Sequence, residues 1–202
     1  MAAHFKKAAG HAARIVVIDG TGLLMRPLVR RSLAPRGRPL VVGYQANHRQ
    51  KVSVQAGLVL RADGSAEALR ARLHADSYVD GAKTAEFLRS LLREFGDGPL
   101  IVLWDRGNMH KGPHVRQVLA EHPRLWVESF PPYCPDLDPV EWLWAWMKYG
   151  RLANLAPRDL RHLVSEVAKA IVAAQENQSL LDGFARAAGL VATEEPERAL
   201  AK

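Results

Sequence analysis

Two acidic residues follow directly on short apolar segments of this chain. Asp19 follows residues 15–18, and Asp105 follows residues 100–104. Apolar, β-branched runs of this length are typical of buried strands. A carboxylate at the edge of a buried sheet loses hydration unless a donor or a cation pairs with it. Divalent cations held by several such carboxylates stabilise the attacking and leaving oxygens of a phosphodiester, so this pattern suits phosphoryl transfer.

A third acid, Glu141, opens a segment with helical spacing. The stretch Asp138-Pro139-Val140-Glu141 has the form of a capping box, with an acid at the N-cap, proline at the first helical position and glutamate at the third. Each aspartate, taken singly, is equally typical of a loop start. The residues alone therefore leave two interpretations open for all three acids, local capping and metal binding.

The elements that must position these acids follow from the hydrophobic periodicity. Alternation predicts strands at residues 39–45, 51–60 and 68–74, and apolar runs predict strands at 15–19, 99–104 and 125–130. Helical spacing predicts helices near residues 87–95, 113–121, 139–148, 157–175 and 180–188, the first with Asp80 as a possible cap. This order predicts an α/β layer fold, a mixed sheet with helices on its faces.

The composition of the chain indicates the kind of partner and the cellular compartment. The 202 residues carry a net charge of +7, and the excess lies in residues 1–75, with 13 basic and 3 acidic side chains against 15 and 18 in the remainder. A basic half favours a polyanionic partner, although solubility alone also accounts for basic charge. The single cysteine excludes an internal disulfide and favours a reduced, cytoplasmic setting. No apolar stretch reaches membrane-spanning length, so we expect no membrane association.

Residues 130–144, Phe-Pro-Pro-Tyr-Cys-Pro-Asp-Leu-Asp-Pro-Val-Glu-Trp-Leu-Trp, resemble a long and unusual family signature. The signature, L-P-P-Y-S-P-D-L-N-P-I-E-x-x-W followed by a lysine, belongs to the DDE superfamily endonuclease domain of mariner-like and related bacterial insertion-sequence transposases. Residues 104–111 resemble the family segment with the second acid and a histidine five residues later, and Ile18-Asp19 resembles the first. Thirty-five residues separate Asp105 from Glu141, a spacing compatible with this group. The similarity covers about residues 14–150.

The resemblance implies an RNase H-like fold with a mixed, five-stranded central sheet flanked by helices. It implies a catalytic and metal-binding triad of Asp19, Asp105 and Glu141 with two Mg²⁺ or Mn²⁺ ions. It further implies cleavage of double-stranded DNA at transposon ends, strand transfer by the resulting 3′-hydroxyl, a homodimer and a nucleoid-associated location in the bacterial cytoplasm. We therefore divide the chain into an N-terminal extension (1–13), a catalytic domain (14–150) and a C-terminal helical extension (151–202).

Nine residues are candidates for DNA binding. His110 is expected to contact phosphate or to shape the metal site, whereas a solvated loop histidine is the alternative. A solvated basic loop is likewise the alternative for the arginines that follow the first strand. A zinc site at His110 and His114 lacks further ligands. The nine candidates are Arg30, Arg31, Arg36, Arg38, Arg49, Lys51, His110, Lys111 and Lys148.

The chain also departs from the family pattern. Gly20 and Arg106 stand where Glu and Asn are common after the first and second acids, and Cys134 and Asp138 replace Ser and Asn. The segment before the first strand is too short for a helix-turn-helix domain, so a separate helix-turn-helix protein is an expected partner. Two other functions stay open: a catalytically inactive or domesticated DNA-binding and assembly remnant, and an RNA:DNA hybrid nuclease.

Overall fold

A five-stranded mixed sheet forms the centre of the computed structural model, which describes residues 13–39, 41–44, 50–105, 107, 110, 112–131 and 134–190. The strand order is β3-β2-β1-β4-β5; β2 pairs antiparallel with β1 and β3, whereas β4 pairs parallel with β1 and β5. This sheet confirms the predicted architecture. The strands are β1 (Arg14–Leu24), β2 (Lys51–Leu60), β3 (Ala66–Ala75), β4 (Leu100–Trp104) and β5 (Leu125–Ser129).

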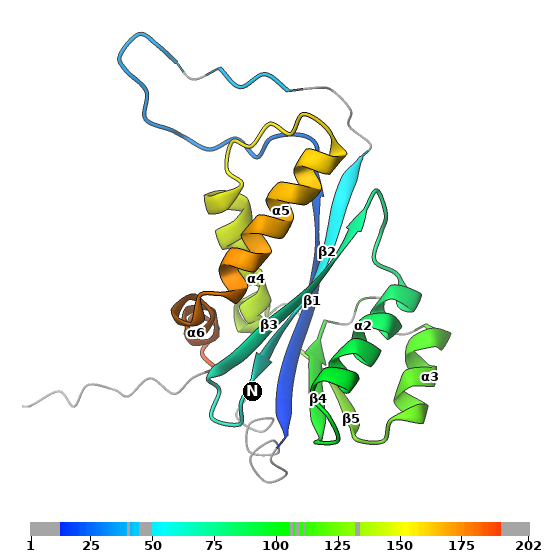
Figure 1. Ribbon diagram of the computed structural model, residues 1–202. Helices are drawn as coiled ribbons and strands as arrows, with labels where there is room; N and C mark the ends of the chain where they lie inside the picture. The colour runs from blue at the N-terminus through cyan, green and yellow to red at the C-terminus, as the bar shows by residue number, and fades with distance from the viewer. Residues whose placement is uncertain are drawn as a thin grey trace, which may run out of the picture.

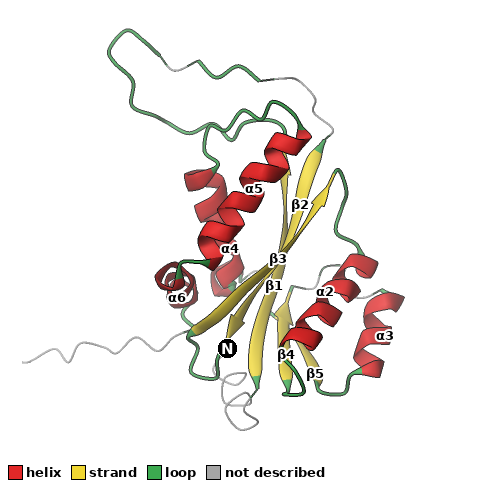
Figure 2. Cartoon of the chain, viewed as in Figure 1, coloured by secondary structure: helices red, strands yellow, loops and turns green. Residues whose placement is uncertain are grey.

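Helices cover both faces of the sheet (Figures 1 and 2). On one face lie α2 (Gly81–Glu94) and α3 (Pro113–Glu121); on the other lie α4 (Pro139–Trp146), α5 (Leu160–Gln175) and α6 (Gln178–Ala187). A 3₁₀ turn (Pro135–Leu137) precedes α4, and a π-helical turn (Met147–Arg151) follows it. Helices α5 and α6, which the sequence places in a C-terminal extension, share a core with the sheet and α4. No helix in the described part of the chain could cross a membrane.

Alternation along β1 and β4 separates two cores. Val17 and Leu103 belong to the core under α4, α5 and α6, whereas Ile18 and Trp104 belong to the core under α2 and α3. Ile18 and Trp104 are also the last residues paired between the two parallel strands. Because side chains alternate between faces, the residues that follow, Asp19 and Asp105, are directed towards the α4 side of the sheet.

Strand β1 is longer than predicted. It does not end at Asp19 but continues to Leu24, and Asp19 pairs with Ala56 of β2. The expectation of a strand end was wrong because it considered only the apolar run, whereas pairing with the long strand β2 carries β1 further. Asp19 therefore lies where β1 leaves its parallel neighbour β4 and remains paired on its other side.

The predicted strand at residues 39–45 is also wrong. Pro39 and Val41–Tyr44 are outside any strand, and Leu40 and Gln45 lie outside the described residues. Val41 is 85% exposed, so its side chain has no core to pack against. The described residues between 26 and 44, here called the arm, instead project away from the sheet (Figure 1).

The foot of the arm is fastened to the chain after α4. Leu28 forms an isolated parallel bridge with Ala153, and its carbonyl accepts a hydrogen bond from the Asn154 N–H at 2.9 Å. The Asn154 side-chain Oδ1 in turn accepts from the Arg30 N–H at 2.7 Å. Asn154 has a φ of 59°, a left-handed conformation that asparagine tolerates better than most residues. The start of the arm is thus held beside the end of α4.

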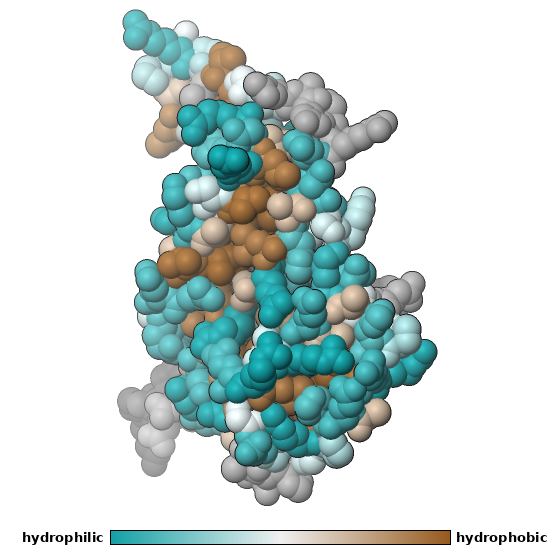
Figure 3. All heavy atoms as spheres, turned by 45° about the vertical axis from the view of Figure 1, so that its right-hand side comes forward, coloured by the Kyte–Doolittle hydropathy of each residue, from teal (hydrophilic) through white to brown (hydrophobic). Residues whose placement is uncertain are grey.

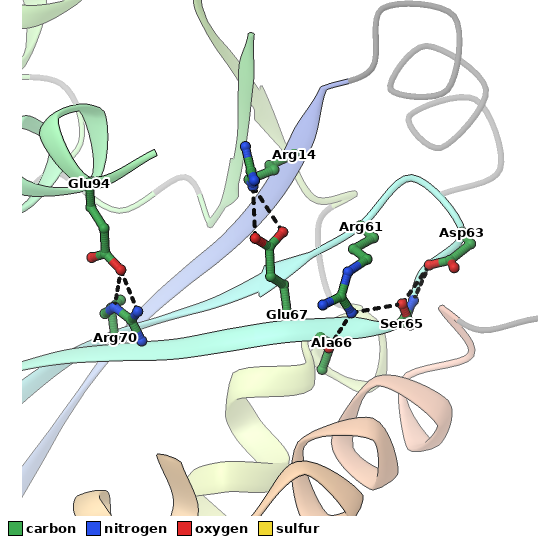
Figure 4. Close-up of polar contacts among 8 residues, drawn as sticks. All are labelled: Arg14, Arg61, Asp63, Ser65, Ala66, Glu67, Arg70 and Glu94. Atoms are coloured by element: carbon green, nitrogen blue, oxygen red, sulfur yellow. Dashed lines mark hydrogen bonds and ion pairs between the residues drawn. The ribbon is translucent and has the colours of Figure 1, made fainter. Parts of the chain in front are cut away.

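Several basic side chains of the sheet are neutralised by neighbouring acids (Figure 4). Arg14 Nε contacts both carboxylate oxygens of Glu67, at 2.8 and 3.0 Å, and Arg70 pairs with Glu94 of α2. The arginines of the arm, in contrast, are exposed. The positive charge that is most accessible to a polyanion therefore lies on the arm rather than on the sheet.

Leu103 tests the core that supports the α4 side of the sheet. Its side chain is 0% exposed, so Leu103→Ala is expected to lower the free energy of unfolding by about 2–5 kcal/mol. The matched substitution Val29→Ala, at a residue that is 80% exposed, is expected to change it by less than about 0.5 kcal/mol. Urea unfolding followed by circular dichroism measures both. Equal effects would contradict the assignment of Leu103 to the core.

Candidate active site

Asp19 and Asp105 come together because of the parallel register between β1 and β4. The residues before them, Ile18 and Trp104, are direct partners on strands that lie about 4.8 Å apart. Both aspartates follow on the α4 side, and α4 packs against β1 and β2. The acids at sequence positions 19 and 105 thereby meet the start of the helix that carries Glu141.

Glu141 is not used as a helix cap. The Asp138 side chain caps α4 by accepting from the Val140 N–H at 2.8 Å, but the Asp138 N–H donates to the Pro135 carbonyl at 2.9 Å. The 3₁₀ turn therefore fills the place that a capping-box glutamate would take. Glu141 is exposed, and no hydrogen bond or ion pair joins its carboxylate to another residue that the structure describes. Of the two interpretations, local capping and metal binding, the geometry is compatible with metal binding because this carboxylate is open to a ligand.

The carboxyl group of Asp19 is largely buried and lies near other acids. Burial is the main cause that raises the pKa of its carboxyl to about 6, and the charges of Glu141 and Asp105 contribute smaller increases. Two hydrogen bonds act in the opposite direction, one from the indole of Trp144 at 2.7 Å and one from the backbone of Gly20. Glu141 and Asp105 are thus close enough for their charges to affect the ionisation of Asp19.

Asp138 adds a fourth carboxyl group to the cluster. Its side chain is buried, and burial raises its pKa to about 8, with the charge of Asp19 as the next cause and those of Glu141 and Asp105 as smaller ones. The hydrogen bond from the Val140 N–H lowers it in part. A carboxyl group that stays protonated near neutral pH resembles the asparagine that the family pattern has at this position.

Asp105 is oriented by the turn that follows β4. Its Oδ1 accepts from the Gly107 N–H at 2.9 Å and lies 2.9 Å from Nε2 of His110. A Cβ at position 107 would approach that oxygen to 2.8 Å, so any other residue there would displace the Asp105 carboxylate from this position. The His110 ring is stacked on Trp104 with centroids 4.1 Å apart and is only 4% exposed, while the Asp105 side chain is 62% exposed. His110 thus contacts Asp105 from the protein side.

The donor set fits a hard divalent cation. Carboxylate oxygens are the ligands that Mg²⁺ and Mn²⁺ prefer, and burial together with the charges of neighbouring acids raises the pKa values of Asp19 and Asp138. Among the described residues, no three His, Cys, Asp or Glu side chains already form a closed ligand group. Binding of a cation by Asp19, Asp105 and Glu141 would require their side chains to move, and those of Asp105 and Glu141 are exposed.

The predicted DNA-binding residues separate into groups. Arg30 places its guanidinium 4.0 Å over the ring of Tyr149, next to Lys148 on the π-helical turn. Lys51 begins β2 and lies over the ring of Tyr78. Arg31, Arg36 and Arg38 are exposed on the arm, whereas Arg49 and Lys111 lie outside the described residues, as do Arg106 and Asn108.

Lys148 and Tyr149 also line a cavity of about 420 Å³ between the end of β1, the foot of the arm and α5. Its walls are mostly apolar, and Arg26 adds a second cation. On the face shown in Figure 3, hydrophobic side chains gather in a band below the arm with hydrophilic residues on either side. Exposed apolar side chains in this part of the chain include Leu24, Leu28, Val29, Leu33 and Tyr149.

Sequence reasoning missed three contributors to the site. Gly107 was not considered, although a glycine two residues after an acid that ends a strand indicates a turn back onto that acid. Asp138 was taken only as a cap or a departure from the family pattern. Trp144 lies within the proline-rich signature and is 2% exposed, but no local pattern indicates its contact with Asp19.

The sequence matches the DDE superfamily endonuclease family over residues 14–164. Solved structures of Mos1 mariner transposase have the same fold: the paired-end complex with Mn gives a TM-score of 0.61 at 17% identity, over 92% of this chain and 54% of that one. The Mos1 catalytic domain gives 0.58 at 15% identity, over 92% and 82%. The chain thus spans about half the length of the Mos1 chain in the paired-end complex. A search of curated protein sequences finds no match.

The sheet order, the helices on both faces and the acids on β1, β4 and α4 define an RNase H-like α/β domain. The family match covers three quarters of the chain and includes all three acids. The chain belongs to the DDE superfamily endonucleases.

Asp138 predicts how stability depends on pH without metal. Its pKa is about 8 in the folded protein and 3.8 in an unfolded chain, so between these values the folded state holds a proton that the unfolded state releases. Stability therefore falls as pH rises from about 4 and levels off above about 8. Asp138→Asn keeps the cap and removes this loss, so its melting temperature in EDTA should exceed that of the wild type increasingly from pH 5 to pH 8.5.

The control is Asp136→Asn, at an exposed carboxylate of the same loop, which should follow the wild type at every pH. Scanning calorimetry at several pH values measures the three proteins. If Asp138→Asn also follows the wild type throughout, Asp138 is not held protonated in the folded state.

Proposed function

We propose that this chain is the catalytic part of a DNA transposase that cleaves transposon ends and transfers them to target DNA with divalent metal ions. The observation that supports this most strongly is that Asp105 after β4 and Glu141 on α4 lie close enough to Asp19 on β1 for their charges to raise its pKa. The family match and the Mos1 fold support the same chemistry. An inactive remnant would have no need to keep all three carboxylates.

Asp19, Asp105 and Glu141 are the residues that would hold two Mg²⁺ or Mn²⁺ ions. Such ions, when bound, lower the pKa of water and stabilise the charge that develops on the reacting phosphate. The remaining tasks fall to the protein. Gly107 and His110 keep Asp105 directed at the site, and the 3₁₀ turn before α4 frees Glu141 from capping.

DNA would approach along the arm and the end of α4. Arg30 and Lys148 lie there near Tyr149, and Arg31, Arg36 and Arg38 extend the positive charge outward. Phosphate neutralisation by these side chains supplies affinity that falls with salt. We further propose a homodimer, which would hold two DNA ends together, and a helix-turn-helix protein or segment that selects the ends. The DNA substrate places this activity at the bacterial nucleoid.

Nicking of supercoiled plasmid in Mn²⁺ tests the proposed activity. Asp105→Asn keeps the shape of the side chain but removes a charged ligand, so the nicking rate should fall at least about 100-fold. Asp97→Asn, at an exposed acid before the opposite end of β4, should leave it unchanged. Nicking that is absent from the wild type, or equal in the wild type and Asp105→Asn, overturns the proposal in favour of an inactive remnant; cleavage of RNA:DNA hybrids alone would indicate the hybrid nuclease.

Glu141→Gln separates ligand binding from helix capping. Glutamine retains the size and polarity of the side chain but is a weaker ligand for a hard cation, so metal-dependent nicking should be lost. Because Asp138 and Pro135 already satisfy the start of α4, the free energy of unfolding in EDTA should change by less than about 0.5 kcal/mol. A clear drop in stability with nicking intact would instead make Glu141 a capping residue.

A further inference from the structure

Trp144 makes a polar contact that its packing does not require. Its indole Nε1–H donates to Oδ2 of Asp19 at 2.7 Å, across the interface between α4 and β1. The side chain is 2% exposed, so its N–H needs an acceptor within the protein. That acceptor is a carboxylate of the candidate metal site, and a hydrogen bond to a charged acceptor is stronger than one to a neutral acceptor.

The position of Trp144 on α4 explains why this contact reaches the site. Trp144 follows Glu141 by three residues, and residues three apart lie on the same side of a helix. One side of α4 therefore carries both Glu141 and the group that contacts Asp19. The position of the helix on the sheet sets these two acids relative to each other.

The other tryptophans of α4 behave differently. Trp142 is 42% exposed, and Trp146 packs edge-on against Phe184 of α6 with ring centroids 6.5 Å apart. In the described residues, neither has a hydrogen bond to an acid of the cluster. These two side chains provide matched controls on the same helix, one for solvent-exposed aromatic surface and one for aromatic packing.

A hydrogen bond of this kind can orient a metal ligand. Outer partners fix the direction of a ligating side chain, and their loss commonly weakens metal binding by about 10- to 100-fold. The Trp144 N–H engages one oxygen of Asp19 and leaves other lone pairs of the carboxylate free. It also adds a favourable interaction with the charged form of an acid that is otherwise surrounded by acids.

We propose that Trp144 is a positioning residue of the metal site, whose indole N–H holds the Asp19 carboxylate in the orientation that binds the divalent ion. This inference rests on the proposed function, because it takes Asp19 as a metal ligand. It adds a role for the tryptophan of the helix, which acts through Asp19 and does not contact the ion itself.

Measurement of Mn²⁺ binding tests the positioning role of Trp144 without DNA cleavage. Binding is followed by the rise in melting temperature with Mn²⁺ concentration and by electron paramagnetic resonance of free Mn²⁺. Trp144→Phe should weaken Mn²⁺ binding at least about tenfold. Replacement of Trp144 by benzothienylalanine, which has sulfur in place of the N–H, preserves the ring shape and should weaken binding to a similar degree. Asp19→Asn should abolish the Mn²⁺-induced rise in melting temperature.

The controls separate positioning from packing. Trp142→Phe should leave stability and Mn²⁺ affinity unchanged, whereas Trp146→Phe should lower the melting temperature in EDTA with Mn²⁺ affinity retained. Wild-type affinity in the benzothienylalanine protein overturns the positioning role, even if Trp144→Phe is too unstable to measure. A wild type without Asp19-dependent Mn²⁺ binding overturns the proposed metal site itself, and the role of Trp144 with it.

Discussion

The structure depends on the mutual repulsion of carboxyl groups that the fold brings to one place. Strands β1 and β4 place Asp19 and Asp105 side by side, and α4 adds Glu141 and the buried Asp138. Gathering four acids opposes folding unless protons, hydrogen-bond donors or cations compensate. Burial, together with the charges of the neighbouring acids, raises the pKa values of Asp19 and Asp138, and a site that is unfavourable without positive charge is suited to binding cations.

Much of the surrounding structure holds these acids in place. The Gly107 N–H and His110, in the turn after β4, contact the Asp105 carboxylate. The Trp144 indole of α4 donates a hydrogen bond to Asp19. The Pro135 carbonyl accepts a hydrogen bond from the backbone N–H of Asp138, so the Glu141 side chain is not needed as its acceptor. Three different elements thus direct three carboxylates, which is how a fold of modest size presents charge accurately to a phosphodiester.

The distribution of basic side chains complements the acidic centre. Arginines on the sheet are paired with acids of β3 and α2, so they add little to the field outside the protein. The arm and the turn after α4 carry exposed or half-exposed cations, and Leu28 and Asn154 join the two segments. A polyanion would therefore meet positive charge at the arm and the end of α4, where the cavity adds apolar surface.

The sequence by itself determined the alternation of strands and helices, the types of the triad residues and the family, because periodicity, chain punctuation and a long proline-rich signature are local properties. Only the tertiary structure decided that β1 runs past Asp19 to Leu24, that residues 41–44 form no strand and that Glu141 is free of capping duty. It alone showed the contact between Trp144 and Asp19, which are 125 positions apart. Strand pairing, burial and pKa depend on neighbours that are distant along the chain, and no local pattern specifies which neighbours these are.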